Sequence, residues 1–353
     1  MKDIAEEYRK LNSSFRKTLI FHLGVDAGFF AEYTYMVNAI LYCLQHKIQF
    51  KIYSADANFG YDKGWTDYFM PFCEEVTEPF HCKYNIHTAP SWRKVFAVCL
   101  QQKNIRFIKW KLKSLATNRI ATVSAFKAYK RRTLLNHNVN FNPNQHFYIP
   151  ELEIDGDYMH AFNKMVEITF RFNKKTTVEC HKLIESLHLP PYYVGCQIRG
   201  GDKATETELL PPEYYVQIMK DKIENQTAFV LTDDYTLFHR LQELSPNTRW
   251  LTLCSPEEKG YANSAFMQTT QLQKKAQITR LMASMQILLN SGYFVGSITT
   301  GPSLFLLKIL YPNVLPADCA PENLKSAIAL PIAERSRIMQ EYINSQLQLH
   351  RHD

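Results

Sequence analysis

The chain has 353 residues, of which 46% are hydrophobic, so it can bury a sizeable core, and its length is typical of about two domains. Its eight cysteines contain no CxxC pair, which excludes the usual spacings of a zinc site and argues against a disulfide framework. The formal net charge is +7, and neither an apolar leader nor a run of about 18 apolar residues occurs, so we expect a cytoplasmic protein.

The first part of the chain predicts a strand, a helix and a second strand. Residues 18–23 form an apolar run, residues 48–53 alternate as a half-buried strand does, and apolar positions recur at helical spacing between them. The turn after the first strand holds Gly24 and Gly28. Such a turn before a helix can receive a phosphate, although this spacing is a weak signal by itself.

A long basic interval follows. No Asp or Glu occurs between Glu78 and Glu151, whereas Lys and Arg are frequent from Arg93 to Arg132. Apolar residues alternate with these charges over 107–115, which predicts a basic amphipathic helix that contacts an anionic membrane or, equally, a solvated helical face. We expect helices over 97–135 and a loop over 136–150, where we place the domain boundary.

Strands and helices alternate regularly in the second half. After a helix pair over 158–187, strands are predicted at 192–199, 227–231, 250–253 and 293–298, each followed by a turn and a helix. This order predicts a parallel, Rossmann-like sheet. Its strand ends at Arg199, Asp233 and Thr300 are expected to share one edge.

The first of these ends carries the strongest chemical signal. Arg199 is followed by Gly200 and Gly201, and a guanidinium offers a planar fork of donors that matches phosphate oxygens. The alternative is an Arg199–Asp202 ion pair in an ordinary turn. At the second end, the paired aspartates position the strand end or a donor, or cap the next helix. No DxD metal motif is present in a suitable loop.

Three ordered motifs carry a family resemblance. Residues 197–203 (Gln-Ile-Arg-Gly-Gly-Asp-Lys), 229–234 and 292–300 resemble the α1,6-fucosyltransferases, the core and nodulation enzymes of the GDP-fucose-dependent superfamily. Residues 58–61 and 64–65 resemble loops in the other half of that family. The resemblance implies a GT-B-like α/β fold with two Rossmann-type domains. Residues 1–150 would form the acceptor-side domain, and residues 151–353 the domain that binds the nucleotide sugar.

The resemblance also implies roles for particular residues. Those with an implied catalytic role are Arg199 (on the diphosphate), Asp202 and Lys203 (at the reacting centre) and Glu206 (the base). Those with an implied donor-binding role are Gln197, Gly28, Tyr61, Asp233, Asp234, Ser284, Thr299 and Thr300. Glu208 lies two residues beyond Glu206, so spacing alone does not choose between the two carboxylates. Gln197 stands where the family has His, Gly200 where it has a second Arg, and Ser284 where an Asp helps to read guanine, which leaves the base open.

The implied activity is an inverting transfer of fucose from GDP-fucose to a hydroxyl of a glycan, without a cofactor or an obligatory metal. The partners would be a GDP-sugar donor and a glycan or lipid-linked oligosaccharide acceptor. Because the added domains of the animal enzymes are absent, a bacterial-type enzyme, cytoplasmic or membrane-peripheral, is expected. The alternatives are a transferase for another GDP-sugar, an inactive sugar-nucleotide or glycan binder, and a basic nucleic-acid-binding protein. No nucleic-acid-binding motif favours the last, and no nucleic-acid partner is expected.

Overall fold

The computed structural model describes residues 3–25, 27–78, 81, 92–102, 105, 108–109, 112, 120–123, 142, 144–201 and 209–349. The chain divides into two compact units, Met1–Asn173 and Lys174–Asp353. The sequence placed the boundary near residue 150. The helix α6 (Tyr158–Thr169) belongs to the first unit because it packs on α2 (Phe29–Gln45), where Tyr158 Oη donates to Asn38 Oδ1 at 2.9 Å.

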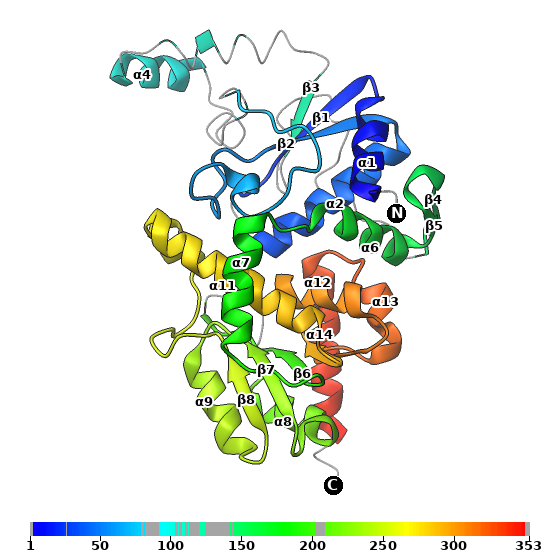
Figure 1. Cartoon of the computed structure of the whole chain (residues 1–353), viewed down its shortest axis with the longest axis vertical. Helices are drawn as coiled ribbons and strands as arrows, with labels where there is room; N and C mark the ends of the chain where they lie inside the picture. Colours follow the sequence, from blue (N-terminus) through cyan, green and yellow to red (C-terminus); the bar gives the residue numbers. More distant parts are fainter. Residues whose placement is uncertain are drawn as a thin grey trace. The chain divides into compact units, whose positions relative to one another are not determined.

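The first unit contains a small parallel sheet in the order β2-β1-β3 (Figure 1). A separate, short antiparallel sheet is formed by β4 and β5. Its remaining described elements are α1 (Ile4–Ser13), β1 (Lys17–His22), β2 (Ile48–Tyr53), η1 (Gly64–Asp67), α4 (Trp92–Gln102), β3 (Ile120–Val123), β4 (Phe147–Ile149), η3 (Pro150–Leu152) and β5 (Ile154–Gly156). The predicted strand, helix and strand over residues 18–53 are therefore confirmed.

Two predictions for the basic interval are wrong in part. Helix was expected throughout 97–135, but Ile120–Val123 forms β3, which pairs with β1 in parallel. The expected loop over 136–150 contains β4, which pairs with β5. For β3 the partner strand β1 is about 100 residues away, and local periodicity does not reveal such a partner. For β4 the partner β5 is the next strand along the chain, but each of the two is only three residues long, too short for an alternating pattern to show. Most of the predicted amphipathic helix over 107–115 lies outside the described residues.

Stacked aromatic rings fill the core of the first unit. The rings of Trp65 and Phe69 stack at 4.2 Å between centroids, and Tyr33 lies nearly parallel to Trp65 at 6.2 Å. Tyr33 Oη also lies 2.6 Å from Thr169 Oγ1, which ties α2 to α6. Aromatic pairs of this kind add to the stabilisation that burial of their area gives.

The second unit contains a five-stranded sheet in the order β10-β9-β6-β7-β8, with every neighbouring pair parallel. The elements are α7 (Lys174–Glu185), β6 (Val194–Gln197), α8 (Pro212–Ile223), β7 (Thr227–Leu231), α9 (Tyr235–Leu244), β8 (Arg249–Thr252), α10 (Asn263–Gln268), α11 (Gln271–Leu289), β9 (Tyr293–Gly296), α12 (Gly301–Leu310), β10 (Val314–Pro316), η5 (Pro321–Asn323), α13 (Leu324–Ala327) and α14 (Ile332–Leu349). The predicted parallel, Rossmann-like sheet is confirmed.

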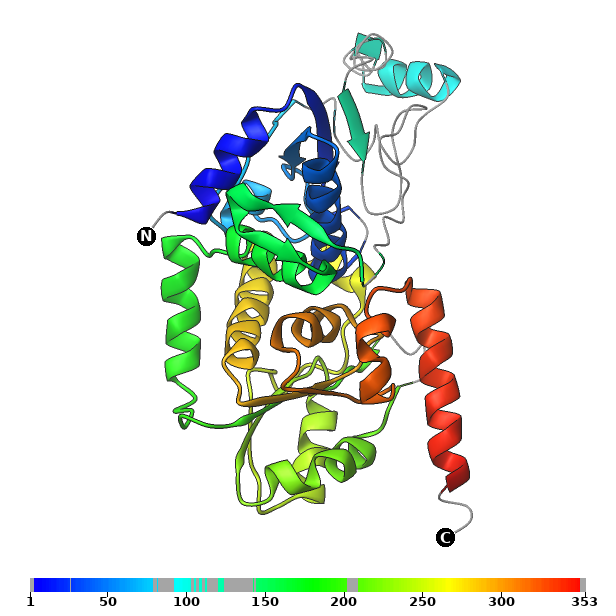
Figure 2. The same cartoon turned by 90° about the vertical axis from the view of Figure 1, so that its right-hand side faces the viewer.

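Helices cover both faces of this sheet, with α8 and α9 on one side and α11 and α12 on the other (Figure 2). Tyr215 of α8 and Leu241 of α9 join the buried cluster that includes Val194 of β6. On the opposite face α11 approaches closely, since a Cβ at Gly195 would lie 2.7 Å from Leu288 Cδ2. A sheet covered on both faces explains why its strands are continuous apolar runs. None of the helices in the described ranges combines the length and apolar composition that a membrane crossing needs.

Candidate functional site

The candidate site lies at the carboxyl edge of the second unit's sheet. The chain runs from β6 outward to β7 and β8, then returns across β6 to β9 and β10. The topological switch point therefore lies between β6 and β9, and ligands of open α/β sheets bind outside the strand ends at such a point. Arg199 follows β6, Thr300 follows β9 and Asp233 follows β7, so the predicted common edge is confirmed.

Gln197 links the two strands of the switch point. Its side chain is buried, and its Oε1 accepts hydrogen bonds from Thr300 Oγ1 and Ser303 Oγ, both at 2.7 Å. Thr300 is the N-cap residue of α12, and Ser303 lies in the first turn of that helix. Two of the residues with an implied donor-binding role, Gln197 and Thr300, are thus in direct contact with one another.

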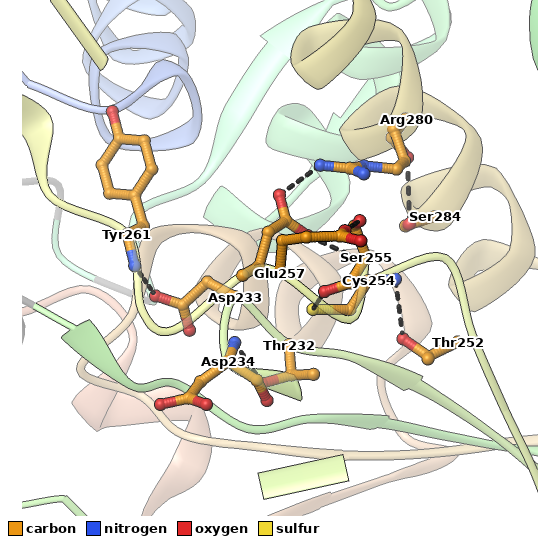
Figure 3. Close-up of polar contacts among 11 residues, drawn as sticks. Thr232, Asp233, Asp234, Thr252, Cys254, Ser255, Glu257, Tyr261, Arg280 and Ser284 are labelled. Carbon is orange, nitrogen blue, oxygen red and sulfur yellow. Dashed lines mark hydrogen bonds and ion pairs between the residues drawn. The ribbon is translucent and has the colours of Figure 1, made fainter. Parts of the chain in front are cut away.

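Asp233 connects the loops that follow β6, β7 and β8. Its Oδ1 accepts a hydrogen bond from Gly200 N at 2.7 Å. Its Oδ2 accepts one from Tyr261 N, also at 2.7 Å, which Figure 3 shows. Arg199 Nη1 lies 2.9 Å from the same Oδ2, and the Arg199 guanidinium lies over the Tyr261 ring at 4.9 Å. A fixed carboxylate and a ring face hold the guanidinium in place. Arg199 thus forms an ion pair with Asp233, a partner that spacing did not indicate.

Asp234 has a structural role. Its side chain accepts from Thr236 N at 2.9 Å and caps the N-terminus of α9, which was one of the two alternatives that the sequence left open. The two glycines after Arg199, Gly200 and Gly201, pack closely against residues near Asp233. Gly201 has a φ of +62°, and a Cβ there would lie 2.3 Å from the Tyr261 carbonyl oxygen. The small size of Gly201 therefore serves the approach of the 253–262 loop, whereas a Cβ at Gly200 would lie 3.0 Å from Asp234 Cβ at the start of α9.

Thr299 faces a buried polar network behind the edge, together with Ser297 and Asp318. Asp318 is fully buried after β10, and its Oδ1 accepts from Ile298 N at 2.7 Å. Its Oδ2 accepts from Ser297 Oγ and, at 3.4 Å, from Thr299 Oγ1. Burial raises the pKa of Asp318 to about 6, and these hydrogen bonds oppose that shift. Sequence reasoning missed Asp318, although its place just after a strand was a usable signal.

Ser284 does not present its hydroxyl to the edge. It is buried on α11 and donates to the Arg280 carbonyl oxygen one turn earlier, at 2.9 Å. Arg280 itself forms an ion pair with Glu258, whose Oε2 accepts from Ser255 N at 2.8 Å. Figure 3 shows Arg280 and Ser284 on the same helix, above the loop that follows β8. Neither Glu258 nor Arg280 was singled out from the sequence.

Gly28 and Tyr61 lie in the first unit, in loops that buried carboxylates organise. Gly28 is the N-cap of α2, but the turn before it is filled by Glu32, which accepts from the backbone amides of Gly24, Val25 and Ala27. This carboxylate therefore binds backbone amides of the same turn in which the sequence suggested that a phosphate could bind. The Tyr61 amide donates to Asp67 Oδ2 at 2.7 Å, and its ring meets Tyr68 edge-on.

A histidine and a carboxylate that sequence reasoning missed lie at the edge of the first unit's sheet. His22, fully buried at the end of β1, has its Nε2 2.6 Å from Asp56 Oδ1. No hydrogen-bond partner for His22 Nδ1 is found among the described residues.

The remaining predictions concern residues 202–208, which lie outside the described part of the chain. Asp202, Lys203, Glu206 and Glu208 therefore keep the roles that the sequence predicted for them, as predictions. Within the described ranges, no three His, Cys, Asp or Glu side chains gather as a metal site requires.

No family model and no curated protein sequence matches this chain. Several solved structures are similar to it. NodZ fucosyltransferase from Bradyrhizobium has 9% identity and a TM-score of 0.47, over 85% of this chain and 96% of that one. FUT1 of Arabidopsis thaliana in complex with GDP has 10% identity and a TM-score of 0.48, over 86% and 73%. POFUT1 in complex with GDP has 11% identity and a TM-score of 0.43, over 85% and 97%.

These structures are fucosyltransferases, the group that the sequence motifs resemble. Because the TM-scores are below 0.5 and the identities are near 10%, the likeness does not assign an activity or a substrate to this chain.

Proposed function

We propose that this chain is a glycosyltransferase that moves fucose from GDP-fucose to a hydroxyl of a glycan. The observation that carries the proposal is the position of Arg199 at the switch point of a parallel sheet, where Asp233 and Tyr261 fix its guanidinium. The three ordered motifs of the sequence support the same proposal. The donor would bind along the strand ends of the second unit, with its diphosphate near Arg199 and Thr300.

The residues at this edge suit the departure of a nucleoside diphosphate. Transfer breaks the bond between the sugar C1 and the diphosphate oxygen, and negative charge develops on that oxygen. A guanidinium and a hydroxyl stabilise such charge without a metal ion. The attacking hydroxyl would lose its proton to Glu206 in a single displacement that inverts C1. Lys203, close to Glu206 in sequence, would keep that carboxylate ionised.

Arg199 is tested by its replacement with Ala or Lys. Arg199→Ala should abolish detectable transfer and weaken GDP binding by about 2 kcal/mol or more, and Lys should restore only part of it because it lacks the planar fork. Arg240→Ala is the matched control, since Arg240 is exposed on α9 and pairs with Glu213 and Glu243. Wild-type GDP affinity in Arg199→Ala would contradict the proposal.

The class of donor is tested on the wild-type protein. In a thermal-shift measurement with GDP, UDP and CDP, GDP should raise the melting temperature of the protein most. A ligand that binds the folded state and not the unfolded chain stabilises the folded state. Donor hydrolysis or transfer that persists after chelation of divalent ions would support metal-independent catalysis. GDP binding without turnover of any GDP-sugar would favour the inactive binder, and turnover of a different GDP-sugar would favour the second transferase alternative.

A further inference from the structure

The loop between β8 and α10, residues 253–262, extends the edge on which the donor is proposed to bind. The Tyr235 amide donates to the Glu258 carbonyl oxygen, and the Gly260 amide donates to the Asp233 carbonyl oxygen, both at 2.9 Å. Tyr261 N then reaches the Asp233 carboxylate. The loop thus passes from the end of β8 across the end of β7 to Arg199, and it carries Glu258 along this edge.

Glu258 and Arg280 form a fixed pair that solvent can reach. The Glu258 carboxylate is held by Ser255 N at 2.8 Å and by Arg280 Nη2. The two side chains are 30% and 28% exposed, so the pair is neither sealed in the core nor mobile in solvent. A loop amide and a helix-borne guanidinium therefore preorganise the carboxylate at the side of the edge beyond Asp233.

Glu258 and Arg280 are the charged pair where the 253–262 loop meets helix α11. Ser284 donates its hydroxyl hydrogen bond to the Arg280 carbonyl oxygen, so this hydroxyl is not directed to the edge of the sheet. Cys254, at the start of the loop, has a pKa raised by burial and by the nearby Glu258 carboxylate, so it stays a neutral thiol. The charged residues of this loop are Glu257, Glu258 and Lys259. Glu258 pairs with Arg280 of α11, and Glu257 accepts a hydrogen bond from Ser255 Oγ. Lys259 forms a backbone bridge with Asp234.

We propose that Glu258 and Arg280 bind the base of the donor and select guanine, an inference that rests on the proposed donor-binding function. Of the four common bases, guanine presents two adjacent donors, N1–H and the 2-amino group, beside the acceptor O6. A carboxylate accepts from the two donors, and an Arg donates to O6. Because a guanidinium has five N–H donors, Arg280 can bond Glu258 and O6 together.

The experiment measures binding of GDP, inosine diphosphate and UDP by calorimetry. Inosine diphosphate keeps N1–H and O6 but lacks the 2-amino group. The wild type should bind GDP about tenfold more tightly than inosine diphosphate, since a hydrogen bond to a charged group contributes about 1.5 kcal/mol or more. In Glu258→Gln this ratio should fall to about one, and UDP binding should not change.

Two further variants make the test specific. Arg280→Lys should weaken the binding of GDP and of inosine diphosphate by the same factor, because both nucleotides carry O6. Glu179→Gln is the control, since Glu179 pairs with Lys275 of the same helix α11 at a similar exposure, 30% and 24%. It should leave all three affinities at the wild-type values.

The outcomes separate this inference from the proposed function. A wild-type ratio near one, or an unchanged ratio in Glu258→Gln, overturns the assignment of the base to this pair while GDP binding itself still stands. If Glu258→Gln does not fold, the wild-type ratio decides, and an Arg280→Lys protein that binds GDP and inosine diphosphate with wild-type affinities overturns the assignment. Failure of the wild type to bind any of the three nucleotides overturns the donor-binding function, and this inference with it.

Discussion

Arg199 Nη1 lies 2.9 Å from Asp233 Oδ2, and this ion pair joins the ends of two neighbouring strands, β6 and β7. The same carboxylate accepts hydrogen bonds from the backbone amides of Gly200 and Tyr261. One side chain therefore fixes three loops and the cation that is proposed to bind the diphosphate. Both side chains are mostly buried, so solvent screens the pair less than it screens a surface ion pair.

Asp233→Ala should lower the free energy of unfolding by about 2–4 kcal/mol, because two amides and a guanidinium lose a partly buried acceptor. Asp234→Ala is the control and should cost about 1 kcal/mol, the usual contribution of an N-cap. Urea denaturation of both variants gives the comparison. Equal costs would show that the Asp233 contacts do not hold the loops.

Gly201→Ala should lower the free energy of unfolding by about 2 kcal/mol or more, since its φ is positive and its Cβ would meet the Tyr261 backbone. Gly28→Ala provides the contrast. Gly28 has a φ of −64°, and no atom lies within 4 Å of its Cβ position, so its cost should stay within about 1 kcal/mol. Thermal melts of the two variants check this, and a Gly201→Ala protein as stable as the wild type would contradict it.

Asp318 should make stability depend on pH. Its pKa is raised in the folded state to about 6, from an ordinary value of 3.8, so the folded protein binds the proton more tightly than the unfolded chain does. The stabilisation is full below about pH 4 and is lost as pH rises through 6.

Relative to Asp318→Asn, which does not titrate, the wild-type free energy of unfolding should fall by about 3 kcal/mol between about pH 4 and 7. Denaturation of both proteins across this range measures the difference. A difference that stays constant, or that grows with pH, would mean that the carboxylate is already ionised in the fold at low pH.

Glu206→Gln should lower kcat by about 100-fold or more with little change in GDP affinity, if Glu206 takes the proton of the acceptor hydroxyl. Glu208→Gln is its neighbour control and should stay within a few-fold of the wild type. Transfer rates at saturating donor, GDP affinities and melting temperatures decide the matter. A Glu206→Gln protein that turns over at the wild-type rate rules it out as the base.

The basic interval from Arg93 to Arg132 should bind anionic vesicles if the acceptor is lipid-linked. Sedimentation at low salt, with release near about 0.5 M salt where the Debye length is about 4 Å, is the expected result. Neutral vesicles serve as the control. Equal binding to both kinds, or none to anionic vesicles, would favour the solvated-face interpretation.

The sequence by itself determined the parallel sheet of the second unit and the edge at which its strands end. Apolar runs of strand length alternating with helical periodicity are local signals, and chain order then limits the topology. Arg199, Asp233 and Thr300 could be placed together on that ground, because parallel neighbours end on the same side.

Only the tertiary structure decided which groups these residues contact. Spacing offered Asp202, which lies outside the described residues, as one ion-pair partner of Arg199. The ion pair with Asp233, 34 positions away, was found only in the tertiary structure. Likewise β3 appeared only through its pairing with β1, and Glu258 met Arg280 only because a loop and a helix converge. Such contacts depend on side-chain direction and on segments distant in the chain, and a local pattern of residue types contains neither.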